Sequence, residues 1–446
     1  MAPEALRRWA PYRASRFARV VGPALLRYRR LEARDARRGA TDEAAWARAH
    51  DRTARGFAAL GEDLGGLFVK LCQVAGARAD VFPPVFLREL GRFHDRVTPR
   101  PFAALAPAVE RELGQPLQAL FPRVDRAPLA AASLAQVHRA WLRSGEAVVL
   151  KIQYPEAERL YARDLAQVRR AVALASRLVR GFAVGGAIRE VAHFVGLELD
   201  FAREAESTER VSAAFADDPD VRVPRVHRAL STPRLLVLEH LEGRPILDVA
   251  RDPATNDLAR AALADRIARI YRRMIFEHGF FHGDPHPGNL LVLPDGRIGL
   301  LDFGLAKALP EGFAHALVGM FEAALRGDRS RAIEAARALG FALDRGDPDA
   351  FVRLLGIALG ARHQLDDLRA AVGASALDAV PADVALVIRT LVLLNGLSER
   401  LAPGERRIAR ALVTGAAAPQ ERPVREADLP SPPAAPTGPP PERLHA

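Results

Sequence analysis

The stretch His282-Gly-Asp-Pro-His-Pro-Gly-Asn289, followed by a short apolar run and Leu301-Asp-Phe-Gly304, decides the fold of this chain. Two apolar segments, 290–293 and 298–301, flank a Pro-Asp-Gly sequence whose composition favours a tight turn between two strands. The pattern therefore predicts a loop, a β-hairpin and a second loop, which together gather three polar side chains: Asp284, Asn289 and Asp302.

These three residues have the spacing of a phosphoryl-transfer site. In the protein-kinase pattern an aspartate of the catalytic loop orients the acceptor, an asparagine five residues later holds one Mg²⁺, and the aspartate of Asp-Phe-Gly holds the other. We therefore predict Asp284 as a catalytic residue, and Asn289 and Asp302 as metal ligands. Two alternatives are local turn capping and a zinc site that adds His282 and His286. The asparagine and the Asp-Phe-Gly favour Mg²⁺, which prefers oxygen ligands.

Length and composition favour a multi-unit enzyme of a reducing compartment. A chain of 446 residues suits two to three folding units. Its single cysteine, Cys72, cannot form an internal disulfide. No signal peptide is evident and no window approaches the ~18 apolar residues of a membrane span. The sequence thus predicts a cytoplasmic protein, with any membrane contact peripheral.

The charge is concentrated in the first 39 residues. This segment carries eleven arginines against three acidic residues, which gives +8 of the formal net +10. A nucleic-acid binder more often spreads its basic face over a folded domain, so we expect no nucleic-acid partner. Apolar residues interleave with the arginines, which predicts a basic amphipathic helix, broken at Pro11 and Pro23, on an anionic membrane surface. A solvated arm and an organelle-targeting peptide are the alternatives. The apolar residues expected at the headgroups are Trp9, Phe17, Leu25 and Leu26.

Lysine is scarce, and its positions are informative. Lys70, Lys151 and Lys307 are the only lysines among 64 basic residues. A compact ammonium fits a confined phosphate or carboxylate pocket where the planar guanidinium does not. This marks Lys70 and Lys151 as site residues, whereas Lys307 is expected on a loop surface.

An alanine-rich loop precedes Lys151. Residues 128–138 read Pro-Leu-Ala-Ala-Ala-Ser-Leu-Ala-Gln-Val-His, and a strand-turn-strand pattern then leads to Lys151. Set against the kinase loop Gly-x-Gly-x-x-Gly-x-Val, alanines fill the three glycine positions, so the backbone should approach phosphates differently. The predicted nucleotide-binding residues of this region are Ala130, Ala131, Ala132, Ser133, Ala135, Val137 and Lys151.

A kinase also needs a helix glutamate that pairs with the strand lysine, and a hinge that meets adenine. Glu204 is the first choice for the pairing glutamate and Glu198 the second. The segment 239–243 follows a short apolar strand and is the predicted hinge, with Glu239 and Leu241 as its nucleotide contacts.

Composition and periodicity divide the chain into five parts. They are a basic amphipathic arm (1–40), a helical extension (41–120) restarted at two adjacent prolines, an N-lobe (121–243), a C-lobe (244–415) and a Pro/Ala-rich tail (416–446). The tail lacks apolar periodicity and is predicted to be disordered. In the extension, Lys70 and Gln73 lie one turn apart on nearly the same helix face.

Over roughly residues 55–405, these elements resemble the UbiB family of atypical protein-kinase-like proteins. The resemblance is carried by Lys70-Leu-Cys-Gln73 before Pro83-Pro84, the alanine loop with Gln136-Val-His138, Lys151, Glu198-Leu-Asp200 with Glu204, His282–Asn289 and Asp302–Gly304. It implies an α+β, bilobed protein-kinase-like fold with an N-terminal all-helical extension. In that fold Lys70 and Gln73 would cover the cleft where a protein acceptor docks, and both join the predicted catalytic set.

The resemblance further implies an ATP- and Mg²⁺-dependent kinase or ATPase that supports ubiquinone or other isoprenoid-lipid metabolism. Isoprenoid lipids or lipid-biosynthesis proteins are then the implied partners. One departure is Cys72, which stands where the family has glycine, so the extension is expected to pack differently over the nucleotide. The alternatives are a small-molecule kinase similar to aminoglycoside phosphotransferases and choline kinases, and a nucleotide-binding scaffold without turnover.

Overall fold

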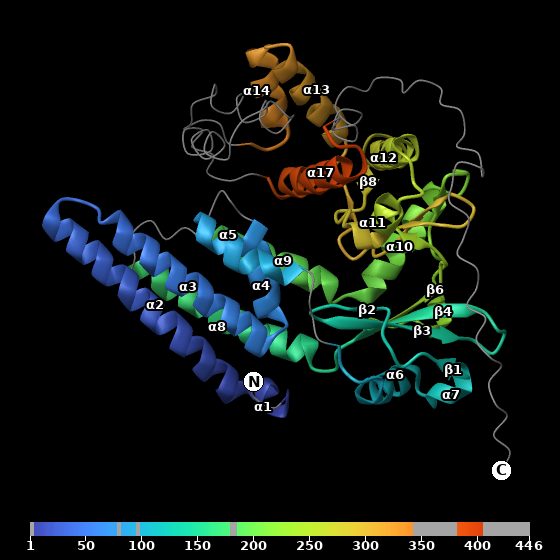
Figure 1. Cartoon of the computed structure of the whole chain (residues 1–446), viewed down its shortest axis with the longest axis horizontal. Coiled ribbons are helices and arrows are strands. Elements are labelled where there is room, and N and C mark those ends of the chain that lie inside the picture. Colours follow the sequence, from blue (N-terminus) through green and yellow to red (C-terminus); the bar gives the residue numbers. More distant parts are fainter. Residues whose placement is uncertain (1–3, 78–81, 95–98, 179–184, 342–380, 405–446) are drawn as a thin grey trace.

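The computed structural model describes residues 4–77, 82–94, 99–178, 185–341 and 381–404. Long N-terminal helices form one body beside an antiparallel sheet, and a second group of helices and short strands lies above that sheet (Figure 1). The molecule is thus α+β, as predicted. The tail predicted for 416–446 lies outside the described residues.

The described residues of the N-terminal region form helices joined by short connections, which confirms the predicted all-helical character of the N-terminal extension. Asp42 begins α3 by accepting a hydrogen bond from the N–H of Ala45, and Pro84 begins α5. The helices are α1 (Glu4–Arg8), α2 (Ala10–Arg38), α3 (Glu43–Leu64), α4 (Leu67–Ala77), α5 (Pro84–Leu90), η1 (Gly91–His94), η2 (Phe102–Ala104), α6 (Ala106–Leu113) and α7 (Leu117–Leu120).

The basic arm is interrupted near Pro11, between α1 and α2, but the predicted break at Pro23 was wrong. Pro11 lies in the first turn of α2, where the missing N–H would have no helical partner anyway. Pro23 lies inside the helix on its exposed side. The opposite side buries Phe17, Ala24 and Leu31. This packing compensates for the one helical hydrogen bond that Pro23 cannot donate. The arm is therefore a docked helix and not a free one.

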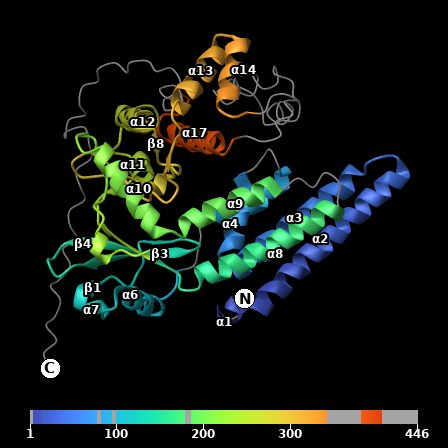
Figure 2. The same ribbon diagram turned by 180° about the vertical axis from the view of Figure 1, so that it is seen from behind.

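A buried ion pair anchors α2 to the rest of the protein. The Arg13 side chain is 3% exposed and that of its partner Asp164 is 1% exposed. Arg13 Nε lies 3.0 and 3.1 Å from the two carboxylate oxygens, and its NH1 donates to the carbonyl of Leu64 at 2.7 Å. Asp164 lies on α8 (Ala157–Leu178), which runs beside α2 (Figure 2).

The N-lobe sheet is antiparallel, with the strand order β1-β3-β4-β6 and β2 paired to β3. The predicted strand-turn-strand is confirmed, although β4 continues two residues beyond Lys151. Beneath the alanine loop the buried Gln136 accepts hydrogen bonds from the N–H of Arg100 at 2.6 Å and the hydroxyl of Tyr154 at 3.0 Å. The strands are β1 (Arg123–Val124), β2 (Ala130–Ala131), β3 (Ala135–Trp141), β4 (Ala147–Gln153) and β6 (Leu235–Glu239).

Two helices, α9 (Gly185–Glu198) and α10 (Phe201–Ala214), connect α8 to the strand that follows. Asp200 caps α10 by accepting from the N–H of Arg203 at 3.1 Å. The cap fixes the first turn of α10, and this turn carries Glu204.

The C-terminal half contains the predicted hairpin, formed by β9 (Leu290–Val292) and β10 (Ile298–Leu300). These strands share a sheet of order β5-β10-β9-β7, and β8 pairs with β11. Fully buried Tyr271, Phe281 and Phe303 belong to the core beneath the hairpin. The other elements are β5 (Val221–Arg222), η3 (Arg228–Leu230), β7 (Arg244–Pro245), α11 (Ile246–Arg251), α12 (Asp257–Arg272), the π-helical η4 (Arg273–Glu277), β8 (Phe280–Phe281), η5 (Pro287–Asn289), β11 (Lys307–Ala308), α13 (Phe313–Leu325), α14 (Arg329–Ala338) and α17 (Ala382–Leu401).

Replacing Arg13 by Met should destabilise the protein by about 3–5 kcal/mol, because the Asp164 charge is then buried without a partner. Burial raises the pKa of Asp164, so the deficit should shrink as the pH falls and the carboxyl becomes protonated. Urea unfolding of the full chain measures both effects.

Arg16→Met is the matched control, since Arg16 pairs with Asp63 but its side chain is 30% exposed. That pair should be worth at most about 1 kcal/mol. Equal losses in the two variants would contradict the anchoring role of Arg13.

Candidate active site

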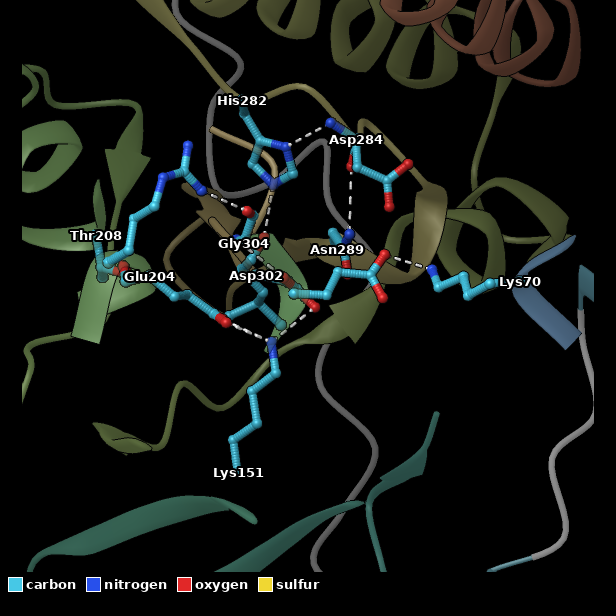
Figure 3. Close-up of polar contacts among 12 residues, drawn as sticks. Lys70, Lys151, Glu204, Thr208, His282, Asp284, Asn289, Asp302 and Gly304 are labelled. Atoms are coloured by element: carbon cyan, nitrogen blue, oxygen red, sulfur yellow. Dashed lines mark hydrogen bonds and ion pairs between the residues drawn. The ribbon is translucent and has the colours of Figure 1, made fainter. Parts of the chain in front are cut away.

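Three charged side chains from three elements meet at the centre of the site (Figure 3). Lys151 of β4 donates to both carboxylate oxygens of Glu204 on α10, at 2.6 and 2.8 Å. Its Nζ also lies 3.1 Å from Oδ2 of Asp302 in the loop after β10. The Glu204 side chain is only 2% exposed, whereas that of Asp302 is 47% exposed. The cluster is thus buried on the Glu204 side and open on the Asp302 side.

Mutual pairing sets the charges of this cluster. Burial raises the pKa of Glu204 to about 7, although the Lys151 ammonium opposes the shift. Burial alone would lower the pKa of Lys151, but the charges of Asp302 and Glu204 outweigh it and the pKa rises. Burial also acts to raise the pKa of Asp302, but Lys151 outweighs it and the pKa falls. At neutral pH the site therefore holds an ammonium beside an ionised, half-exposed Asp302.

Asp302 has a backbone conformation that non-glycine residues rarely adopt. Its φ is 57°, the only positive φ of a non-glycine residue in the described ranges. Asp302 Oδ1 accepts from the N–H of Gly304 at 3.2 Å, which supports this turn. Such a conformation is strained and persists only where the surrounding structure offsets the strain. Residues of this kind cluster at functional sites.

The loop after β8 supplies Asp284 and Asn289. The N–H of Asp284 donates to Nδ1 of His282 at 3.1 Å, so the His282 proton lies on Nε2, which donates to the carbonyl of Leu301 at 2.7 Å. Asn289 donates through Nδ2 to the carbonyl of Asp284 at 3.2 Å. Its amide oxygen is then the atom that remains for a metal.

These bonds contradict the zinc alternative. Both ring nitrogens of His282 are engaged with the backbone, and Nδ1 of His286 accepts from the N–H of Gly288. Within the part of the chain that the structure describes, no three His, Cys, Asp or Glu side chains are grouped as a metal site. The two oxygen donors, Asn289 and Asp302, suit a Mg²⁺ whose other ligands are phosphates and water.

The helical extension reaches the site through a different pair from the one expected. Glu198, the second choice as partner of Lys151, pairs instead with Lys70 of α4. Gln73 of α4 donates to the carbonyl of Phe93 in η1 at 2.9 Å, so this contact stays within the helical extension. Glu198 fails as the Lys151 partner because it ends α9, whereas Glu204 lies on α10 beyond the intervening turn.

Cys72 fills the interface between α3, α4 and η1. Its side chain is 3% exposed, and its thiol lies 3.5 Å from the carbonyl of Phe57. Burial raises the pKa of this thiol to about 12. The side chain that replaces the family's glycine therefore packs inside the extension and does not enter the charged cluster.

The predicted nucleotide loop is compact. Ala130 and Ala131 form β2, and the N–H of Ala132 donates to the carbonyl of Ala135 at 2.8 Å. Val137 pairs directly with Lys151 across β3 and β4. Ser133 is buried at the turn.

Part of the predicted hinge already forms hydrogen bonds and an ion pair within the protein. The N–H of Glu239 donates to the carbonyl of Arg225 at 2.8 Å, and its carboxylate pairs with Arg222 at 2.6 Å. This pairing excludes the N–H of Glu239 as an adenine donor. The Leu241 side chain lies close to Gly299 of β10, since its Cδ1 is 3.4 Å from the position that a Cβ on Gly299 would occupy. The nucleotide contact of Leu241 stays a prediction.

Lys307 differs from the surface position expected. It pairs with Asp383 in the first turn of α17, and Thr390 of the same helix donates to the carbonyl of Gly283 at 3.3 Å. Sequence reasoning missed α17 as a support of the catalytic loop, because about 100 residues separate the two in the chain.

A family model described as ABC1 atypical kinase-like domain matches residues 92–336. The chain is 32% identical over 271 residues to AarF domain-containing protein kinase 1 of Xenopus laevis, covering 60% of this chain and 52% of that protein. It is 36% identical over 259 residues to ACTIVITY OF BC1 COMPLEX KINASE 3, chloroplastic, of Arabidopsis thaliana, covering 57% and 36%.

A solved structure is also similar. The complex of Rv3197 with erythromycin from Mycobacterium tuberculosis matches with a TM-score of 0.56 and 25% identity, over 84% of this chain and 98% of that chain. The chain spans about half the length of the first curated relatives it matches, 52% and 51%. The similarities to the family model and the solved structure agree with the bilobed kinase-like fold predicted above.

Replacing Gly283 by Ala should disrupt the catalytic loop, since a Cβ there would lie 2.4 Å from the carbonyl oxygen of Leu305. Overpacking of this kind costs about 1–3 kcal/mol. We expect a lower urea midpoint for the full chain. Gly196→Ala on exposed α9, where a Cβ meets nothing within 4 Å, is the control and should leave the midpoint unchanged or raise it. Unchanged stability of Gly283→Ala would contradict the close approach.

Proposed function

The chain belongs to the family of ABC1 atypical kinase-like proteins, the UbiB family, and from this premise we propose that it binds Mg-ATP and transfers the γ-phosphoryl group. The single observation that carries the proposal is the contact of one ammonium, that of Lys151, with both Glu204 and Asp302. In protein kinases the strand lysine must be held by a helix glutamate while the Asp-Phe-Gly aspartate holds the metal, and both conditions must be met together.

Mg²⁺ fits the residues at this site. Asp302 is ionised and 47% exposed, and Asn289 retains its amide oxygen once Nδ2 has donated to Asp284. When bound, Mg²⁺ would neutralise charge on the transferring phosphates. The protein's own contribution is to hold these two oxygens and the Lys151 ammonium in place before the nucleotide arrives.

Asp284 is the proposed catalytic residue. Its carboxylate orients the acceptor hydroxyl or water and takes its proton as the new oxygen–phosphorus bond forms and the bond to ADP breaks. The backbone around it is fixed by His282 on one side and Asn289 on the other. This loop therefore has little freedom to move the base away from the phosphates.

The acceptor that we propose is water or a small lipid-linked molecule and not a protein. The pair formed by Lys70 and Glu198 brings the extension to the edge of the site, where a peptide acceptor would need room. The negative charge of Glu198 also acts to raise the pKa of Glu204, after the larger effect of burial. A small-molecule kinase of the aminoglycoside phosphotransferase type would lack this extension, and a scaffold would show no turnover.

Mg-ATP should raise the melting temperature of the full chain, and Asp302→Asn and Lys151→Ala should each abolish most of that shift. Lys151→Arg should also weaken it, because the guanidinium does not fit between two carboxylates that enclose a compact ammonium. Lys307→Ala is the control, since it removes a lysine paired outside the cluster. A full Mg-ATP shift in both Asp302→Asn and Lys151→Ala would refute the assigned site.

We also propose that the protein acts at an anionic membrane surface, where isoprenoid lipids are accessible. Among the described residues, no helix is long and apolar enough to cross a bilayer. One face of α2 exposes Arg19, Leu26, Arg30 and Arg37, which lie 4 or 7 residues apart and hence on one stripe. Trp9 is 59% exposed and Leu26 is 54% exposed, whereas Phe17 is buried and cannot enter the headgroups as predicted.

Only part of the arginine charge is available for such binding. Arg7, Arg8, Arg13, Arg16 and Arg34 of the N-terminal segment form ion pairs with acidic residues of the protein. The exposed stripe supplies three of the remaining arginines, Arg19, Arg30 and Arg37. Each arginine near an anionic surface contributes about 1 kcal/mol.

Replacing Arg19, Arg30 and Arg37 together by Gln should weaken binding to phosphatidylserine-containing vesicles by about 3 kcal/mol, or on the order of 100-fold. Flotation at low and high salt measures it, with phosphatidylcholine vesicles as the uncharged comparison. The matched control replaces the exposed Arg326, Arg329 and Arg331 at and near α14, far from α2 in Figure 1. Equal binding of both triple variants at low salt would remove α2 from the membrane contact.

A further inference from the structure

One arginine beside the charged cluster has no role in the function proposed so far. Arg203 precedes Glu204 on α10, and its side chain points to the Asp-Phe-Gly segment. NH1 donates to the carbonyl of Gly304 at 2.9 Å, and NH2 donates to the carbonyl of Ala306 at 2.7 Å. A guanidinium is suited to this contact because its N–H groups are held in one rigid plane.

The segment that Arg203 holds is strained and short. It begins at Asp302, with its positive φ, and Phe303 is buried at 1% exposure. Phe313, the first residue of α13, follows Gly304 by only nine positions. This connection is too short to fold back against Asp302 and support it. The support must therefore come from elements already packed against it.

Two supports are present, one on each side. Gly283 lets the carbonyl of Leu305 approach the catalytic loop, and Arg203 holds the two neighbouring carbonyls from α10. The turn that positions Arg203 also positions Glu204, since Asp200 accepts from the N–H groups of both residues. A shift of α10 would consequently move the partner of Lys151 and the clamp on the Asp302 loop together.

We propose that Arg203 is a positioning residue that clamps the main chain after Asp302 and so orients the Asp302 carboxylate to bind the metal. With this clamp the site is assembled before nucleotide binds, and it needs no separate activating segment. The inference rests on the proposed function for its metal readout, but the clamp itself is testable without nucleotide.

The first measurement is hydrogen exchange of the full chain without nucleotide. Arg203→Met keeps most of the side-chain length and removes every donor, so the backbone N–H groups of residues 304–308 should exchange at least about 10-fold faster. Arg203→Lys can satisfy one carbonyl and should fall between Met and wild type. Wild-type exchange rates in the Met variant would overturn the proposal.

The second measurement is the Mg²⁺ dependence of ATP turnover. Loss of hydrogen bonds from a charged donor should raise the Mg²⁺ concentration for half-maximal turnover by about 10- to 100-fold. At saturating Mg²⁺ the KM for ATP should change much less, because Lys151 still has Glu204. Equal changes in both constants would indicate a general loss of structure and overturn the positioning role.

Arg260→Met is the matched control, because Arg260 of α12 also donates to two carbonyls, away from the site, and pairs with Asp257. Its NH1 lies 3.3 Å from the carbonyl of Ala250 and 2.6 Å from that of Thr255. It should lower stability but leave the Mg²⁺ dependence unchanged. If the wild-type chain does not turn over ATP, the proposed function fails and the exchange measurement alone decides the clamp. If Arg203→Met does not fold, Arg203→Lys decides both readouts by the same criteria.

Discussion

The contact of the Lys151 ammonium with Glu204 and Asp302 is the interaction on which the rest of the structure depends. A buried cation needs opposite charge close by, and removing one partner of such a pair leaves a charge whose desolvation is not offset. The three residues come from a strand, a helix and a loop. The strand order of the N-lobe, the cap of α10 and the hairpin must therefore all be correct for any one of these charges to be stable.

The N-terminal helices are attached by the same kind of contact, used twice. Arg13 of α2 pairs with Asp164 of α8, and Lys70 of α4 pairs with Glu198 of α9. In each case a cation from an N-terminal helix meets an acid from a helix that follows β4. The first pair is buried, whereas the second is partly exposed and lies beside the candidate site. The N-terminal helices are thus fixed more firmly by the first pair than by the second.

The site was largely predictable because its motifs are local. A loop, a two-strand hairpin and an Asp-Phe-Gly require only short-range rules, and the structure has them at the predicted residues. The failures concern tertiary contacts. The continuity of α2 through Pro23 depends on packing against other helices, which overrides a local rule. The choice between Glu198 and Glu204 depends on the helix boundary at Asp200. Arg203 gave no signal, because arginine is the commonest charged residue of this chain.

The scarcity of lysine has a consequence for chemical labelling. Each of the three ammonium groups is held by a carboxylate: Lys70 by Glu198, Lys151 by Glu204 and Lys307 by Asp383. An acylating reagent that reacts with free amines would find no unpaired lysine side chain on the folded protein. On the proposed function, an ATP analogue that carries an acyl group on its phosphates would be brought to Lys151 and to neither of the other two lysines. Occupancy of the proposed site could then be followed in the purified protein by the modification of a single peptide.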